Sequence, residues 1–249
     1  MDLRPITAAT PEVLLQGTVL RLVQQQGINS LDPLVDNLEQ LARLEALVET
    51  SKPLPQAAGL ATPIHPLLSS PFRYPPLRHG SRFGTPQTRG MFYGSRSRKG
   101  CLVEGAFYAL LFWDGMIDPP SAPIRRRQTL FAVLLNADRG LKLQTIADRA
   151  AQSTLQDPIA YGPTQQLGDW MREHGIGAFE YLSARSSEVM VQVGAFTPAV
   201  FQSTPFDQVE ITTEFTADHA SFLCHDNGQL HHFPRELFLI EGQLPRAAS

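Results

Sequence analysis

Arginine, tyrosine and one glutamate gather in residues 72–113, whose sequence is FRYPPLRHGSRFGTPQTRGMFYGSRSRKGCLVEGAFYALLFW. Guanidinium groups bind phosphate oxygens through paired, charge-assisted hydrogen bonds. Aromatic side chains pack against flat rings, and a carboxylate stabilises positive charge that develops beside it. These residue types therefore suit a ligand that carries phosphates, a flat ring and a bond whose cleavage generates positive charge.

The arginines of this stretch are candidate anion ligands. Arg73 and Arg82 lie on either side of a turn rich in proline and glycine, where backbone amides can approach a ligand closely. Two guanidinium groups near one loop would hold a pyrophosphate, although spacing alone favours two surface arginines. The glycine patterns of a Walker loop and of a Rossmann fingerprint do not occur.

The aromatic and acidic residues each have a structural and a functional interpretation. Phe92 and Tyr93 end a short glycine-bounded strand, and alternation sends their rings to opposite faces. Core packing of both rings is the simplest interpretation, and an aromatic pocket wall is the alternative. Glu104 falls in the first turn of an expected helix over 102–113, where the helix dipole is a sufficient reason for a carboxylate.

A second polar group follows later in the chain. Tyr181, Ser183 and Arg185 alternate with apolar residues, which places their side chains on one side of an expected strand. Their hydroxyl and guanidinium groups would complete a pocket or form the polar face of a half-exposed strand.

A metal site is not expected, although four residues with ligating side chains lie close together: Cys224, His225, His231 and His232. If residues 227–228 form a two-residue hairpin turn, Cys224 faces His231 while the other two histidines point to the opposite face. Four ligands cannot converge in that arrangement. A Gly-x-Ser-x-Gly nucleophile elbow is also missing from the sequence.

Composition indicates a soluble globular protein. The 249 residues are 43% hydrophobic and 18% charged, and the formal net charge of -3 gives no general attraction to nucleic acid or anionic membranes. Residues 125–127 form one basic run, interpreted as a solvated turn. No apolar run approaches the roughly 20 residues that span a bilayer, and no signal peptide is evident, so a cytoplasmic protein is expected. Cys101 and Cys224 are expected to be small buried residues.

The first part of the chain predicts a helical hairpin. One helix is expected over 11–26, and a second from Asp32 with an apolar stripe at Leu34, Leu38, Leu41, Leu44 and Val48. This hairpin would pack on the main domain or form a dimer contact, and an arm that docks a regulatory partner is the alternative. Residues 51–70 have the composition of a linker. The expected division is an extension with linker over 1–60 and a catalytic domain over 61–249.

The later part predicts a mixed α+β domain with a largely antiparallel sheet. After the helix over 102–113, periodicity and turn signals predict the following elements: a strand over 129–135, a turn over 136–140, a short helix within 141–151, a helix over 163–174, strands over 178–182, 189–196 and 209–215, and a hairpin near 226–228.

Taken in order, these residues resemble the RES-domain toxins of bacterial RES-Xre toxin–antitoxin pairs. The resemblance covers roughly residues 72–201 and runs through these positions: Arg73-Tyr74, Gly80-Ser81-Arg82-Phe83, Gly90-Met91-Phe92-Tyr93-Gly94, Glu104, Gly175-Ile176, Tyr181 and Ser183-Ala184-Arg185. The family's turn is often Gly-Gly-Arg-Trp, so this chain keeps the arginine at Arg82 and changes the neighbouring aromatic residue to Phe83.

The resemblance implies an ADP-ribosyltransferase-like fold, with a sheet core flanked by helices, and degradation of NAD. The family's arginine, glutamate and serine correspond to Arg73 or Arg82, Glu104 and Ser183. The implied catalytic residues are Glu104, Arg82, Tyr93 and Ser183. The implied NAD-binding residues are Arg73, Tyr74, Gly80, Arg82, Tyr93 and Ser183.

The resemblance also implies partners. NAD would be the substrate, with inorganic phosphate or water as acceptor and without a further cofactor or a metal. An Xre-type antitoxin would be the protein partner, and no membrane or direct nucleic-acid contact is expected; a homodimer is one expected assembly. Transfer of ADP-ribose to a protein is the alternative activity, and a catalytically silent binding or structural protein is the alternative of another class.

Overall fold

A single large sheet forms the framework of the protein. The computed structural model describes residues 6, 10–25, 36–37, 39–40, 42–44, 47, 64–73 and 80–246. The strands are β1 (Val13–Gln24), β2 (Phe92–Ser95), β3 (Ile124–Lys142), β4 (Ala178–Leu182), β5 (Val191–Ala195), β6 (Phe206–Phe215), β7 (His219–Cys224) and β8 (Leu230–Pro234). Their order is β1-β2-β5-β4-β3-β6-β7-β8, with β1 also paired to β3.

The helices are few and short apart from one. They are α3 (Pro66–Ser69), α4 (Arg98–Asp114), α5 (Arg149–Leu155) and α6 (Gly162–Glu173), with 3-10 turns η2 (Ser70–Phe72), η3 (Leu143–Thr145), η4 (Pro198–Val200) and η5 (Arg235–Phe238). Of the strand pairs, β3–β4 is parallel and the others are antiparallel. The expected α+β class with a largely antiparallel sheet is confirmed.

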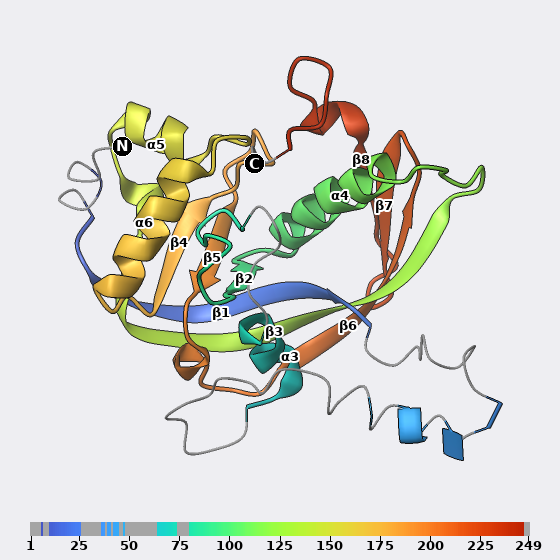
Figure 1. Ribbon diagram of the computed structural model, residues 1–249, viewed down its shortest axis with the longest axis horizontal. Helices are drawn as coiled ribbons and strands as arrows, with labels where there is room; N and C mark the ends of the chain where they lie inside the picture. Colours follow the sequence, from blue (N-terminus) through green and yellow to red (C-terminus); the bar gives the residue numbers. More distant parts are fainter. Residues whose placement is uncertain are drawn as a thin grey trace.

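Part of the sheet closes on itself. Because β1 pairs with both β2 and β3, strands β1, β2, β5, β4 and β3 form a ring. The β1–β3 ladder is long, from Val13 opposite Gly140 to Gln24 opposite Gln128, whereas β1 meets β2 at one residue pair. Strands β6, β7 and β8 continue the sheet beyond the ring, at the other end of β3 (Figure 1).

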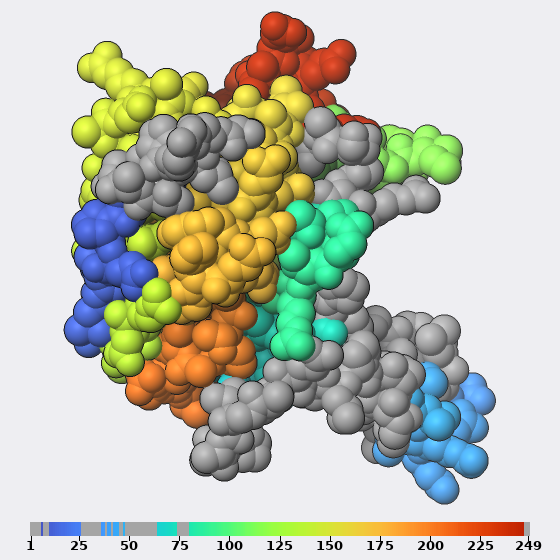
Figure 2. All heavy atoms as spheres, turned by 60° about the vertical axis from the view of Figure 1, so that its left-hand side comes forward, coloured from blue at the N-terminus to red at the C-terminus, as the bar shows by residue number. Residues whose placement is uncertain are grey.

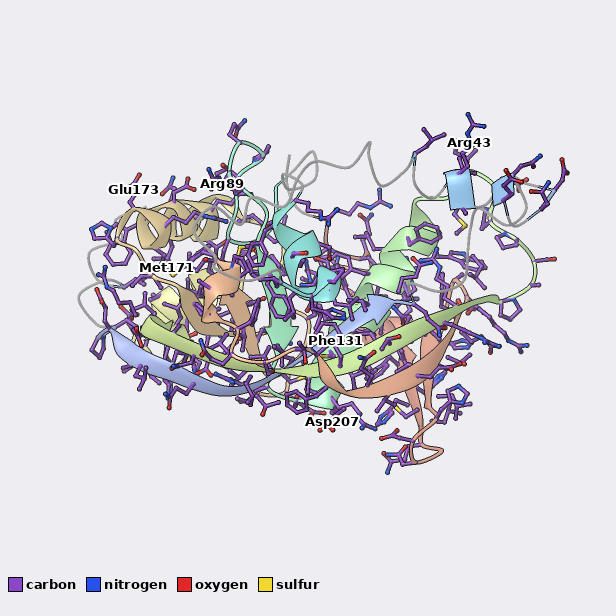
Figure 3. All side chains as sticks on the ribbon, turned by 90° about the horizontal axis from the view of Figure 1, so that it is seen from below. Arg43, Arg89, Phe131, Met171, Glu173 and Asp207 are labelled. Carbon is purple, nitrogen blue, oxygen red and sulfur yellow. The ribbon has the colours of Figure 1, made fainter. Side chains whose placement is uncertain are left out.

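Helices cover the two ends of this sheet separately. Helix α4 lies across β7, where Phe107 and Leu110 share a core with Phe222. Helices α5 and α6 lie beside β4 at the opposite end (Figure 1), and Met171 is buried between α6 and the sheet (Figure 3). A third core, which contains Phe131, joins β1, β2, β3, β4 and β5.

The helix expected over 11–26 is wrong, because this segment is strand β1. Leu15 and Val19 are its two fully buried residues, and a spacing of four fits one face of a helix as well as one face of a strand. Two features favour the strand: Gly17 has a φ of +114°, which a helix does not allow, and the long ladder with β3 satisfies the backbone. The first segment therefore contributes to the same sheet as the later residues.

Other expectations for the first part of the chain are outside the described residues or stay predictions. Residues 39–40, 42–44 and 47 have helical backbone, which agrees with the second expected helix, while Leu34, Leu38, Leu41 and Val48 lie outside the described residues. Residues 51–63 of the expected linker also lie outside them, and residues 66–69 form α3. The boundary near residue 60 stays a prediction.

Later elements are mostly confirmed, with two corrections. Helix α6, strands β4, β5 and β6, and the β7–β8 hairpin lie where they were expected. The turn expected over 136–140 is wrong, because β3 continues through it to pair with β1 and β4. Helix α4 begins at Arg98, where the Ser97 hydroxyl caps it by accepting from the Gly100 amide at 3.1 Å. None of the described helices is long and apolar enough to cross a membrane.

An ion pair connects the strands of the ring near the point where β1 and β2 share one residue pair. Arg96 follows β2, and its Nε donates to Oε1 of Glu180 on β4 at 2.6 Å. The other guanidinium nitrogens donate to the carbonyl oxygens of Thr18 (2.8 Å) and Gln16 (3.1 Å) on β1. Arg96 therefore joins β1 to β4 beside the single β1–β2 residue pair.

We expect Arg96→Ala to destabilise the protein by about 3 kcal/mol, because it leaves the Glu180 carboxylate, whose side chain is 8% exposed, without its cation. Urea unfolding followed by circular dichroism measures the change. Lys99→Ala is the matched control, because its ion pair with Glu188 is exposed on both sides and such pairs contribute less than about 1 kcal/mol. Equal losses in the two variants would contradict the role given to Arg96.

Candidate functional site

A cavity of about 380 Å³ lies between α4, the strands β1, β2, β3 and β6, and the loop before β2. This volume is within the range of about 300–1,000 Å³ that is typical of small-ligand sites. Its wall contains one glutamate, several arginines and several tyrosines: Glu104, Arg21, Arg82, Arg126, Tyr93, Tyr108, Tyr161 and Tyr181. The structure thus brings together Glu104, Arg82 and Tyr93, three of the residues predicted from the sequence.

Glu104 faces the cavity from the middle of the helix. Since α4 begins at Arg98, Glu104 lies beyond its first turn, and the helix dipole does not explain its presence. Among the described residues it has no hydrogen bond or ion pair. Burial raises the pKa of its carboxyl, and the positive charges of Arg185 and Arg82 oppose that increase. A carboxylate of this kind is available to interact with a ligand.

Two backbone carbonyls and one aromatic ring hold the guanidinium of Arg82 in place. Its Nη1 donates to the carbonyl oxygens of Leu155 (3.1 Å) and Asp157 (2.9 Å), and the guanidinium lies 4.7 Å from the ring centroid of Tyr161. Its Nη2 is buried and has no hydrogen-bond partner among the described residues. A buried donor without a partner is costly. Arg82 also lines the cavity, so its positive charge would attract an anion there.

The loop that carries Arg82 is fixed by Tyr93 and by α6. The Tyr93 hydroxyl donates to Ser81 Oγ at 2.9 Å and accepts from the Phe83 amide at 3.0 Å. Burial raises the pKa of Tyr93 to about 12, so the phenol is neutral at physiological pH. Figure 2 shows the segment around residues 80–90 against α6, where the Thr164 hydroxyl donates to the Arg82 carbonyl at 2.5 Å.

Phe92 and Tyr93 point to opposite faces, as alternation predicts. Phe92 is fully buried and packs edge-on against Phe201 at a centroid distance of 4.8 Å. Tyr93 lines the cavity instead, which matches the interpretation of an aromatic pocket wall.

The structure places Ser183 off the cavity wall. Its side chain is buried, and its Oγ accepts from the Arg185 amide at 3.1 Å. The guanidinium of Arg185 lies 3.8 Å from the ring centroid of Phe107 and donates to the Tyr161 hydroxyl at 2.5 Å. Ser183 and Arg185 therefore form a layer behind the cavity, and Arg185 contributes positive potential to Glu104.

Three further residues were predicted to bind the ligand: Gly80, Arg73 and Tyr74. Gly80 adopts a φ of +72° beside the cavity, where a Cβ would lie 2.4 Å from the Gly84 carbonyl, so the turn requires glycine. Arg73 follows η2 and is not part of the cavity wall. Tyr74 lies outside the described residues.

Arg21 of β1 lines the cavity, although the sequence did not predict it as a site residue. Its Nη1 donates to the Tyr93 carbonyl at 3.0 Å, and its guanidinium lies 4.7 Å from the ring centroid of Phe92. Burial lowers its pKa to about 10, and it remains a cation at neutral pH. The interpretation of residues 11–26 as a helix concealed this role. The β-branched residues Thr18, Val19 and Val23 around Arg21 were the available signal for a strand.

The basic run at 125–127 is not a solvated turn, because it lies within β3. Strand alternation sends Arg125 and Arg127 outward, to Glu214 at 2.7 Å and Glu210 at 3.8 Å. Arg126 faces the cavity.

The histidine-rich hairpin holds no metal-ligand cluster among the described residues. Its loop is longer than expected, because Phe222 pairs with His231 and Leu223 with Leu230. Cys101 and Cys224 are both free and buried, which confirms the expectation for the thiols.

Fold and site together define a small α+β protein with a positively charged ligand cavity around one carboxylate. A family model described as "RES domain" matches residues 53–217, and the chain belongs to the RES-domain family. No curated protein matches the chain. A solved structure, the crystal structure of the M. tuberculosis MbcT-MbcA toxin-antitoxin complex, is similar at 14% identity and a TM-score of 0.45, over 86% of this chain and 92% of that chain.

The raised pKa of Glu104 predicts that this residue lowers stability. Below its ordinary pKa the carboxyl is protonated in both folded and unfolded protein, and above its raised pKa it is ionised in both. The cost of burying the charge therefore appears as the pH rises between these two values. We expect Glu104→Gln to unfold at a higher temperature than the unchanged protein at pH 7, and at a similar temperature below pH 4.

Thermal unfolding between about pH 3 and pH 8 measures this difference. Glu188→Gln is the control, because that carboxylate is exposed. A Glu104→Gln variant that is less stable at pH 7 would contradict the electrostatic description of the cavity.

Proposed function

We propose that the protein is a toxin that degrades NAD by cleaving the bond between nicotinamide and ribose. The observation that carries this proposal is the cavity whose wall holds three arginines, Arg21, Arg82 and Arg126, together with the single carboxylate of Glu104. A dinucleotide offers a matching set of groups, since it has two phosphates, flat rings and a ribose that becomes positive when nicotinamide leaves. Membership of the RES-domain family supports the same activity, because the resemblance implies it.

In this proposal the arginines bind the pyrophosphate of NAD, and the tyrosines line the cavity around the dinucleotide. Arg82, which lines the cavity, binds a pyrophosphate oxygen, and Arg21 supplies a second cation from β1. Tyr93 stays neutral and lines the wall beside the nicotinamide ribose. Arg73 stays a predicted ligand from the resemblance, although it does not line the cavity, and Tyr74 stays one that lies outside the described residues.

Glu104 has the central chemical role in the proposed reaction. Its carboxylate accepts a hydrogen bond from a ribose hydroxyl and stabilises the oxocarbenium-like transition state. The C1′–N bond breaks, and nicotinamide leaves with the electron pair. An oxygen of the acceptor then forms a bond to C1′. Water gives ADP-ribose and releases a proton, whereas inorganic phosphate gives ADP-ribose 1″-phosphate.

The proposed biological setting is a toxin–antitoxin pair. An Xre-type antitoxin that covers the cavity is the proposed partner. Membership of the RES-domain family supports this setting, because the resemblance implies such a partner for its toxins.

Incubation of the purified protein with NAD tests the activity, with and without phosphate and with products identified by mass. We expect free nicotinamide and either ADP-ribose or its phosphate. Glu104→Gln should lower turnover by several orders of magnitude while circular dichroism shows an intact fold, because the shape remains and the charge is lost. Unchanged nicotinamide release from that variant, or intact NAD with the unchanged protein, would rule out the proposal.

We also expect Arg82→Ala to weaken NAD binding more than Ser183→Ala does. Arg82 lines the cavity, whereas Ser183 accepts from the Arg185 amide behind it. Calorimetric titration of both folded variants with NAD gives the two dissociation constants. Equal constants would contradict the assignment of Arg82 to the pyrophosphate.

A further inference from the structure

The cavity extends along α4 beyond Glu104, and Arg126 lies at that second end. The Arg126 guanidinium is 4.1 Å from the ring centroid of Phe112 and 5.2 Å from that of Phe215. Phe112 is two helical turns beyond Glu104, which corresponds to about 12 Å along the helix axis. Arg126 is therefore too far away to act on the same group of a ligand as Glu104.

Nothing in the described part of the chain neutralises Arg126. Its side chain is partly buried, and it has no hydrogen bond or ion pair to a described residue. Its neighbours Arg125 and Arg127 both pair with glutamates of β6 on the other face of the sheet. The rings of Phe112 and Phe215 hold the Arg126 guanidinium, and Arg126 lines the cavity, where a flat ring of a ligand can stack on it.

Polar groups at this end of the cavity have a defined orientation. Thr213 pairs with Arg126 in the β3–β6 ladder, and its buried hydroxyl donates to Oε1 of Gln128. The carbonyl oxygen of that amide is thereby occupied, which leaves the amide nitrogen of Gln128 as the group that can donate to a ligand. Both side chains line the cavity. A flat cation next to an amide donor is a suitable site for a heteroaromatic base, which offers a π-face and ring nitrogens that accept.

We propose that this end is a subsite for the purine of an adenine nucleotide, with the base stacked on Arg126 and its edge bonded to Gln128. The inference rests on the proposed function, because it places the second half of the same dinucleotide. The two rings of NAD are joined by two riboses and a pyrophosphate, so the nicotinamide ribose can lie at Glu104 while the adenine lies at Arg126. Arg126 is then a binding residue that increases affinity without contacting the bond that breaks.

Two shorter ligands test the two ends of the cavity separately. ADP contains the adenine half and nicotinamide mononucleotide contains the reacting half. We expect Arg126→Ala to raise the dissociation constant for ADP about tenfold, the scale of one lost base-stacking contact, and to raise the KM for NAD similarly with little change in kcat. Turnover of nicotinamide mononucleotide should stay unchanged. Arg126→Lys, which keeps the charge but not the plane, should recover only part of the affinity.

Arg127→Ala is the matched control, because it removes an arginine from the same strand that faces the opposite way and pairs with Glu210. It should bind ADP like the unchanged protein, and thermal unfolding checks that each variant is folded. Equal ADP affinity in folded Arg126→Ala and Arg127→Ala would overturn the inference, as would equal loss of turnover on NAD and on the mononucleotide.

Calorimetry with ADP distinguishes failure of this inference from failure of the proposed function. ADP binding that depends on Arg126 in a protein that leaves NAD intact would support the subsite and reject the proposed reaction. Cleavage of NAD that is indifferent to Arg126 would support the reaction and reject the subsite.

Discussion

Several guanidinium groups lie close to one carboxylate, and the rest of the structure depends on how the positive charge of these arginines is stabilised away from water. Moving an ion out of water is costly unless other groups replace the water. Here the replacement is largely neutral: the carbonyl oxygens of Leu155, Asp157, Pro158 and Tyr93 accept from Arg82, Arg185 and Arg21. Because neutral acceptors hold the arginines without cancelling their charge, the cavity keeps its attraction for an anion.

Aromatic rings provide the remaining contacts of these cations. Each guanidinium lies over a ring, which gives attraction without a counter-charge. The four pairs are Arg21 with Phe92, Arg82 with Tyr161, Arg126 with Phe112 and Arg185 with Phe107. The rings come from β2, α4 and the residue before α6, so the cavity exists only when the closed part of the sheet, α4 and α6 are all in place. Stability and ligand binding are coupled for that reason.

Local patterns predicted those parts of the fold whose signal lies within a few residues. Strand β4 and helix α6 were correctly predicted, because apolar spacing and turn residues marked their ends. Strand β1 was not, since the spacing of Leu15 and Val19 fits helix and strand equally and its ladder partner is more than a hundred residues away. The turn expected at 136–140 failed for the same reason: pairing with β1 and β4 keeps an otherwise turn-like sequence extended.

The sequence by itself determined the types of residue that the cavity uses, since the ordered set of motifs that includes Arg82, Tyr93 and Glu104 indicated a family and a class of ligand. Only the tertiary structure decided which arginines face the cavity. It brings in Arg21 and Arg126 and leaves Arg73 outside the wall, because strand pairing and side-chain alternation set the direction of each guanidinium. Those directions depend on contacts between distant segments, and spacing along the chain does not contain them.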